Sequence, residues 1–286
     1  FEYIHLNWDL SWPWLTLGNS FSSYPMLIQW YEYTGVGGGS MWILIANLFI
    51  VQAISHKKYI YSSMFVVFVP IAISFLISAN FETSHTQKFV VVQPNIDPYI
   101  EKFNGLSADQ QLDQFIDCAL FEIDSTTNYL VGPETALIEG IWESKIENAT
   151  SIIKLKNLIN QFPDLQILVG ATTYKKYDSK LTNTARSFSN SNLFYDVFNS
   201  ALYINKSGVE VYHKSKLVQG VEFMPFAKVL GKLKFLSIDL GGISGSLGTQ
   251  EYRSVFTKDS TRLAPIVCYE SIYGEYVSEF VRNGAN

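Results

Sequence analysis

The stretch Tyr129-Leu130-Val131-Gly132-Pro133-Glu134-Thr135 joins a short apolar run to a carboxylate at its end. A short apolar run bounded by turn residues is typical of a buried β-strand. The Gly-Pro pair ends that strand because proline has no N–H to donate to a neighbouring strand. A glutamate in this position is well placed to face a cleft. The stretch therefore predicts a buried strand that presents Glu134 at its carboxyl end.

Strand and helix patterns alternate on both sides of this stretch. A β-branched run at 89–92 ends before Pro94, and 165–172 (LQILVGAT) is a second apolar strand pattern. Ser107 and Gln110 form a capping box before apolar residues at helical spacing. Further strands are predicted at 200–205, 208–212, 252–256 and 263–268, a polar helix at 146–159, and a surface loop with a hairpin at 175–199. This alternation predicts a layered α/β fold.

Two later stretches carry an amine and a thiol in similar contexts. They are Tyr212-His213-Lys214-Ser215-Lys216-Leu217-Val218 and Pro265-Ile266-Val267-Cys268-Tyr269-Glu270. Cys268 is predicted to end an apolar strand, where its side chain can face a site. A nearby cation lowers the pKa of a thiol, and Lys214 is a candidate for it. Taken singly, the cysteine also fits a core residue, and the lysine and the glutamate fit solvated surface residues.

Composition excludes several classes of function. The 286 residues carry a formal charge of −5 without a dense basic cluster, which gives no reason to expect a nucleic-acid partner. The two cysteines, Cys118 and Cys268, are too few for a disulfide framework, and Cys118 fits a small buried residue on a helix. The four histidines have no metal-ligand spacing, so neither a metal nor another cofactor is expected. The run 241–246 has the wrong spacing for a serine nucleophile and predicts a turn.

The first 82 residues have a different character. The ranges 33–55 and 59–81 contain no charged residue, and about 20 apolar residues span a bilayer. Pro70 inside the second range is tolerated in membrane helices, and the glycines from Gly35 to Gly39 permit close helix packing. His56-Lys57-Lys58 between the ranges predicts a cytoplasmic loop, which places both ends of the hairpin outside. The alternative is a buried core hairpin of a soluble protein.

Aromatic residues gather before the first apolar range. Trp-Pro-Trp-Leu-Thr-Leu-Gly-Asn-Ser occupies 12–20, and further rings stand at Trp8, Trp30, Tyr31 and Tyr33. Such amphipathic rings are typical of a membrane interface. A packed loop is the alternative interpretation.

These motifs together resemble one protein family. The order Glu, Lys, Cys is similar to the nitrilase superfamily. The words Gly-Pro-Glu-Thr, Tyr-x-Lys-x-x-Leu-Val and Cys-Tyr-Glu, with the aromatic entry at 12–20, resemble the apolipoprotein N-acyltransferases of the bacterial inner membrane. The resemblance implies an internal fragment with a membrane region at 1–82. It also implies an extracytoplasmic nitrilase-like αββα sandwich at 86–286, incomplete at its C-terminus.

The resemblance also implies residue roles. Cys268 would be the nucleophile, Glu134 the proton acceptor, and Lys214 the oxyanion donor together with a backbone N–H near Tyr269. Glu222 would support the lysine, Tyr269 and Glu270 would shape the site, and Phe103 would contact an acyl chain. Many members have Leu-Val-Pro-Phe-Gly-Glu where this chain has Leu-Val-Gln-Gly-Val-Glu at 217–222. The register of Glu222 therefore rests on loop length alone.

The activity implied is acyl transfer in the inner membrane by a multi-pass, monomeric protein whose catalytic domain is periplasmic. A phospholipid would donate an acyl chain to the cysteine. The N-terminal α-amine of a diacylglyceryl-modified lipoprotein would then accept it. Two alternatives stay open, a membrane-tethered amidase of the nitrilase type and a non-catalytic lipid-binding scaffold.

Overall fold

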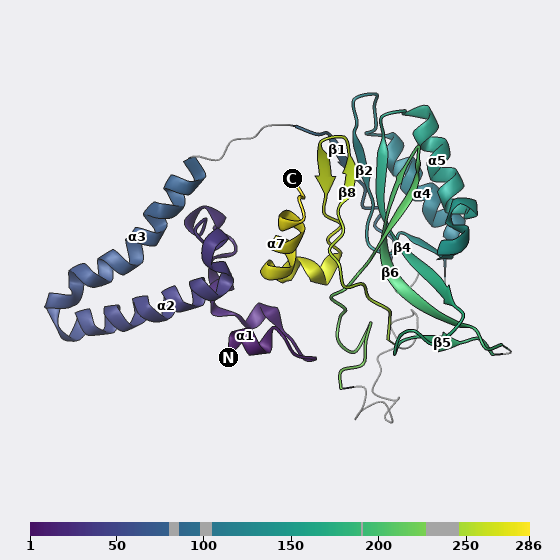
Figure 1. Ribbon diagram of the computed structural model, residues 1–286. Coiled ribbons are helices and arrows are strands. Elements are labelled where there is room, and N and C mark those ends of the chain that lie inside the picture. Colours follow the sequence, from purple (N-terminus) through teal and green to yellow (C-terminus); the bar gives the residue numbers. More distant parts are fainter. Residues whose placement is uncertain (80–85, 98–104, 190, 227–245) are drawn as a thin grey trace. The chain divides into compact units, whose positions relative to one another are not determined.

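The computed structural model describes residues 1–79, 86–97, 105–189, 191–226 and 246–286 (Figure 1). The chain divides into two compact units, Phe1–Thr86 with Ile272–Glu275, and Gln87–Ser271 with Tyr276–Asn286. Phe103 and residues 241–245 of the predicted turn lie outside the described residues.

Two long apolar helices dominate the first unit, α2 (Tyr31–Ser55) and α3 (Ile60–Ala79). They pack against each other, and the indole N–H of Trp42 donates to the carbonyl of Val66 at 2.8 Å. By length and composition, α2 and the segment Lys57–Ala79 that contains α3 can each cross a membrane. In their most apolar stretches, only 17% and 11% of the residues, respectively, are buried within the chain. Their apolar surfaces therefore need cover from outside this unit, as a bilayer provides. The predicted end of the second range, at 80–81, lies outside the described residues.

The aromatic entry packs on the start of α2. It contains a short helix, α1 (Glu2–His5), and 3₁₀ turns at Pro13–Leu15, Leu17–Phe21 and Pro25–Leu27. The amide of Gly18 donates to Ser40 Oγ at 2.9 Å, and the hydroxyl of Tyr31 donates to the carbonyl of Gly18. A Cβ atom on Gly18 would overlap the backbone of Val36. This close approach fixes the segment while Trp12 and Trp14 stay about half exposed, at 51% and 50%.

Among its described residues, the second unit is centred on a seven-stranded mixed sheet. Its strands are β1 (Phe89–Val91), β2 (Tyr129–Val131), β3 (Leu137–Trp142), β4 (Gln166–Tyr177), β5 (Arg186–Ser187), β6 (Phe194–Asn205) and β7 (Gly208–His213). β1, β2 and β4 are parallel neighbours, β3 pairs parallel with the outer part of β4, and β6 pairs antiparallel with β4, β5 and β7. The strands β8 (Phe256–Lys258) and β9 (Thr261–Leu263) make a separate hairpin, and α7 (Gly274–Arg282) follows.

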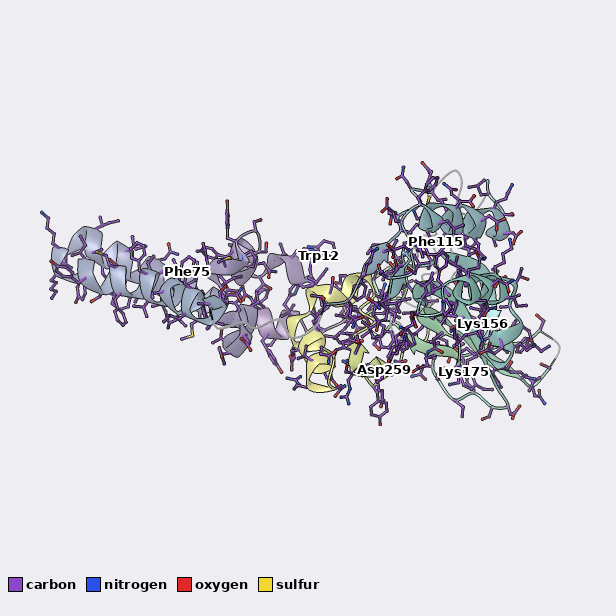
Figure 2. All side chains as sticks on the ribbon, turned by 90° about the horizontal axis from the view of Figure 1, so that it is seen from above. Trp12, Phe75, Phe115, Lys156, Lys175 and Asp259 are labelled. Atoms are coloured by element: carbon purple, nitrogen blue, oxygen red, sulfur yellow. The ribbon has the colours of Figure 1, made fainter. Side chains whose placement is uncertain are left out.

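Two amphipathic helices, α4 (Ala108–Leu120) and α5 (Thr150–Gln161), pack against one face of the sheet (Figure 1). The capping box predicted at Ser107 and Gln110 is present and starts α4. Phe115 on α4, labelled in Figure 2, is 2% exposed. Alternate residues of β4 and β6 complete this core, as the period of two along a strand requires. The α/β prediction is confirmed at the level of a mixed sheet with covering helices.

Several predicted boundaries are wrong. The hairpin predicted within the loop at 175–199 is present, since β4 continues to Tyr177 and pairs antiparallel there with Phe194 of β6. The strand predicted at 200–205 therefore begins earlier, at Phe194. An aromatic cluster of Trp142, Tyr174, Phe188 and Tyr195 packs on this arm, with ring centroids 4.8–6.1 Å apart. Cross-strand aromatic packing stabilises a strand pair whose composition is polar.

The strands predicted at 252–256 and 263–268 are also displaced. Only Phe256 of the first range lies in a strand, and β9 ends at Leu263. Pro265 has no N–H to donate to a ladder, and the amide of Ile266 turns back to the carbonyl of Ala264 at 3.0 Å. The polar helix begins at Thr150, later than predicted, after a 3₁₀ turn at Glu143–Asn148, and β3 was not predicted.

We expect Leu155→Ala to lower the free energy of unfolding by about 2–5 kcal/mol, because this fully buried side chain fills the contact between α5 and the sheet. Ile153→Ala on the same helix is the control, since Ile153 is 49% exposed. Denaturant unfolding of the two variants measures the difference. Equal losses would contradict the assigned core.

Candidate active site

Glu134 lies in a loop that the backbone of β4 holds in place. The amide of Gly132 donates to the carbonyl of Leu168 at 2.8 Å, and the amide of Gly170 donates to the carbonyl of Pro133 at 3.1 Å. A Cβ atom at Gly170 would come within 2.5 Å of the amide nitrogen of Thr135. Glycine is therefore required here so that the loop can approach the strand. The glutamate side chain keeps 30% of its surface exposed.

Lys214 follows β7, and its side chain is almost completely buried, at 1% exposed. Its Nζ donates to Glu134 Oε1 at 2.8 Å, and it lies 2.9 Å from Glu222 Oε2 and 3.1 Å from Glu222 Oε1. Burial alone would lower the pKa of Lys214, but the carboxylates of Glu222 and Glu134 raise that pKa above its ordinary value. The lysine is therefore a fixed cation between two carboxylates.

Glu222 reaches the lysine even though its loop lacks the usual proline. Its Oε2 accepts from the backbone N–H of Val218 at 2.8 Å, and the amide of Glu222 donates to the carbonyl of Val218 at 2.9 Å. Gly220 between them adopts a φ of +77°, a conformation that glycine adopts without strain. The tight turn thus fixes the register of Glu222 in place of the missing proline.

Cys268 does not end a strand, contrary to the prediction. It begins a 3₁₀ turn, Cys268–Ile272, and its φ of +46° lies in the left-handed region that non-glycine residues rarely adopt. The residue is exposed, and its thiol forms a hydrogen bond with the carboxylate of Glu134. Strained backbone of this kind occurs most often at functional sites.

Lys214 lowers the pKa of Cys268, as expected. Partial desolvation and the negative charge of Glu134 outweigh this effect, so the net pKa of the thiol lies above its ordinary value. The pKa of Glu134 itself is lowered: desolvation acts to raise it, and the combined effect of Lys214, Asn199 and Cys268 outweighs that. The resting site therefore holds a neutral thiol beside an ionised carboxylate.

Glu270 is fully buried and does not point at the thiol. Its Oε1 accepts from the hydroxyls of Tyr212 and Tyr276 and from the amide of Ser215, each at 2.7 Å, and its Oε2 accepts from the amide of Val267 at 2.9 Å. Burial and the charge of Glu270 raise the pKa of both tyrosines, which stay neutral donors. Glu270 thus ties the segment after Lys214 to the segment before Cys268.

The remaining predicted residues differ in outcome. Tyr269, directly after the cysteine, is buried at 4% exposed, and Phe103 lies outside the described residues.

Sequence reasoning missed Asn199 on β6, whose side-chain amide donates to Glu134 Oε1 at 2.5 Å and to Glu222 Oε1 at 2.7 Å. The available signal was a polar residue inside a strand pattern. Among the described residues, no group of three or more His, Cys, Asp and Glu side chains could hold a metal ion.

A thiol hydrogen-bonded to a carboxylate, next to a buried lysine, has the parts of a cysteine-nucleophile acyl-transfer site on a mixed α/β unit. A family model described as the apolipoprotein N-acyltransferase N-terminal domain matches residues 1–49. The apolipoprotein N-acyltransferase of Chlorobaculum tepidum is 27% identical, over 99% of this chain and 56% of that protein. The enzyme of the same name from Rickettsia typhi is 26% identical, over 96% of this chain and 53% of that protein.

These comparisons confirm the resemblance to apolipoprotein N-acyltransferases that the sequence motifs indicated. The chain spans about half the length of the curated relatives it matches. Among solved structures, a glutamine-dependent NAD+ synthetase from Acinetobacter baumannii has a TM-score of 0.35 and 13% identity, covering 68% of this chain and 30% of that chain.

We expect Gly170→Ala to push the Glu134 loop away from β4, because the new methyl group would meet the backbone of Thr135 and Glu134. With the carboxylate displaced, the pH midpoint for alkylation of Cys268 by iodoacetamide should fall. Gly274→Ala is the control, since a Cβ there meets no atom within 4 Å. Unchanged midpoints in both variants would contradict the role given to the loop.

Neutralising the negative or the positive partner of Cys268 should move the pH midpoint of its alkylation in opposite directions. Glu134→Gln removes the negative charge that raises the pKa of Cys268, so the midpoint should fall. Lys214→Met removes the cation that opposes this rise, so the midpoint should increase. Alkylation rates of the Cys268 peptide across pH, followed by mass spectrometry, measure both. Shifts of the same sign would refute the charge assignment.

Proposed function

We propose that this protein takes part in lipoprotein maturation. It would transfer an acyl chain from a phospholipid through Cys268 to the N-terminal α-amine of a diacylglyceryl-cysteine lipoprotein. The observation that carries the proposal is the buried Lys214, which two carboxylates hold beside the thiol of Cys268. Similarity to apolipoprotein N-acyltransferases over nearly the whole chain supports the same reaction.

The first half-reaction forms a thioester. Glu134 takes the proton of Cys268 as the sulfur attacks the ester carbonyl of the phospholipid. Lys214 Nζ and a backbone N–H near Tyr269 stabilise the oxyanion of the tetrahedral intermediate. When the ester C–O bond breaks, the leaving lysophospholipid oxygen receives the proton from Glu134. Because the pKa of the free thiol lies above its ordinary value, the nucleophile forms mainly when Glu134 accepts its proton.

The second half-reaction forms an amide. The neutral α-amine of the lipoprotein attacks the thioester carbonyl, and Glu134 accepts the proton that the nitrogen loses. The C–S bond then breaks, and the cysteine sulfur regains its proton from Glu134. Water must be kept away during the lifetime of the thioester, since hydrolysis would waste the acyl chain. Lys214 keeps its positive charge in both half-reactions, so it can stabilise the oxyanion in each of them.

The membrane setting belongs to the proposal. Both substrates carry acyl chains that are anchored in a bilayer, so the site should lie at its surface. α2 and α3 are the spans, the basic Lys57-Lys58 turn is cytoplasmic, and residues 86–286 form a periplasmic catalytic domain of nitrilase-like αββα type. The membrane region is 1–82, Phe103 contacts the acyl chain, and the protein acts as a monomer of the inner membrane.

The two alternatives predict different behaviour of the same thiol. A membrane-tethered amidase would share Glu134, Lys214 and Cys268, but it would release its acyl group to water. A lipid-binding scaffold would need no reactive thiol, and the hydrogen-bonded arrangement of all three residues argues against it. The names of the relatives favour neither alternative.

We expect Cys268→Ala in the full-length protein to abolish lipoprotein N-acylation, because the acyl chain then has no covalent carrier. Cys118→Ala is the matched control, since this half-buried cysteine lies on α4 and packs against the core. Complementation of a strain depleted of its own N-acyltransferase, with mass analysis of a lipoprotein N-terminus, reads both variants. N-acylation that survives Cys268→Ala would end the proposal.

A further inference from the structure

Asn199 occupies the centre of the charged cluster, although it carries no charge. It lies on β6, paired with Thr172 of β4, and it is 5% exposed. Its backbone carbonyl accepts from the amide of Lys214 at 2.8 Å. Its side-chain nitrogen donates to both glutamates, at 2.5 Å to Glu134 and 2.7 Å to Glu222. One residue therefore contacts all three charged members of the site.

The bonds from Asn199 and from Lys214 end on the same oxygens. Lys214 Nζ and Asn199 Nδ2 both donate to Glu134 Oε1, and both donate to Glu222 Oε1. The four groups form a closed ring of alternating donors and acceptors. Glu134 also forms a hydrogen bond with the thiol of Cys268. Two carboxylates this close would repel each other without donors between them.

The identity of the amide atoms follows from the same ring. If the side-chain amide were reversed, Asn199 Oδ1 would face two carboxylate oxygens and would repel both. In the orientation observed, Oδ1 is buried without a hydrogen-bond partner among the described residues. A buried acceptor left without a donor costs free energy. The position thus keeps a neutral double donor even though its other polar atom is not satisfied.

We propose that Asn199 is a positioning residue for the acyl-transfer site, which fixes Glu134 and Glu222 around Lys214 and aims Glu134 at the thiol of Cys268. This inference deepens the function proposed above and rests on it for the reaction that the site performs. Asn199 acts through the two glutamates and does not touch the reacting atoms. Its contribution is a neutral donor, because aspartate has the same shape and would add a third carboxylate to the ring.

The charged groups that act on the thiol are Glu134, Lys214 and Glu222, whereas Glu270 is occupied by two tyrosines and backbone amides. Asn199→Ala removes a donor that holds Glu134 near the thiol. The alkylation midpoint of Cys268 should therefore move to lower pH, as it should when Gly170→Ala displaces the same carboxylate. Asn199→Asp adds a negative charge to the cluster and should move the midpoint to higher pH.

The test uses the full-length protein with iodoacetamide as probe and mass analysis of the Cys268 peptide. At pH 7 we expect alkylation to become about threefold faster in Asn199→Ala and about tenfold slower in Asn199→Asp, since each pH unit of midpoint corresponds to a tenfold change in thiolate. Asn205→Asp is the matched control on the same strand. Its Oδ1 accepts from the amides of Ser207 and Gly208, a role that aspartate keeps.

The outcomes separate this inference from the proposed function. Midpoints that stay at the unsubstituted value in both Asn199 variants, while thermal stability falls, would mean that Asn199 only packs, and the inference would be overturned. Alkylation needs no lipid. If the midpoints shift as expected but the unsubstituted protein acylates no lipoprotein, the role of Asn199 stands and the proposed function fails.

Discussion

The ammonium group of Lys214 is buried with 1% of its side chain exposed, and its burial constrains everything around it. An isolated charge in such a place would lose its hydration, so the group requires close partners of opposite sign. Glu134 and Glu222 supply them from two different segments. Because two glutamates surround one lysine, the cluster carries an excess negative charge. That charge contributes to the raised pKa of the Cys268 thiol.

The sheet explains why these partners meet. Glu134 leaves β2 in a loop that rests on Gly170 of β4, Asn199 lies on β6 beside β4, and Lys214 leaves β7 beside β6. Neighbouring strands thus present their polar residues at one place, as short connections between paired strands allow. The cysteine reaches the same place by another route. Buried Glu270 joins the backbone at Val267 to the backbone at Ser215 and so couples the Cys268 turn to the lysine.

Local sequence predicted the parts of this arrangement that depend on local chemistry. The capping box at Ser107, the strand at Tyr129–Val131 and the apolar helices follow from nearest-neighbour patterns and were found where predicted. A hairpin was predicted within 175–199, but the length of the arm of β4 and β6 was not, because its stability comes from cross-strand aromatic contacts of Trp142, which composition does not reveal. The turn at Cys268 was not predicted because the apolar spacing at 263–268 resembles a strand, although Pro265 has no N–H to donate to a neighbouring strand.

The site likewise contains residues that local sequence motifs identify and one that they do not. Glu134, Lys214 and Cys268 stand in short motifs that a family resemblance identifies. Asn199 stands in no motif, and its importance follows from contacts with residues 65 and 23 positions away in the sequence. The direction of the shift in the thiol pKa could not be predicted either. It depends on the balance between desolvation, the charge of Glu134 and the charge of Lys214, and that balance depends on the three-dimensional arrangement.

The most direct test of the central claim is the intact mass of the full-length protein after incubation with phospholipid and without a lipoprotein acceptor. The account predicts a long-chain acyl adduct on Cys268 that hydroxylamine removes and that an added diacylglyceryl-cysteine peptide discharges as an amide. A Cys268 that small thiol reagents modify readily, yet that never carries an acyl chain from phospholipid, would contradict the account and favour an amidase.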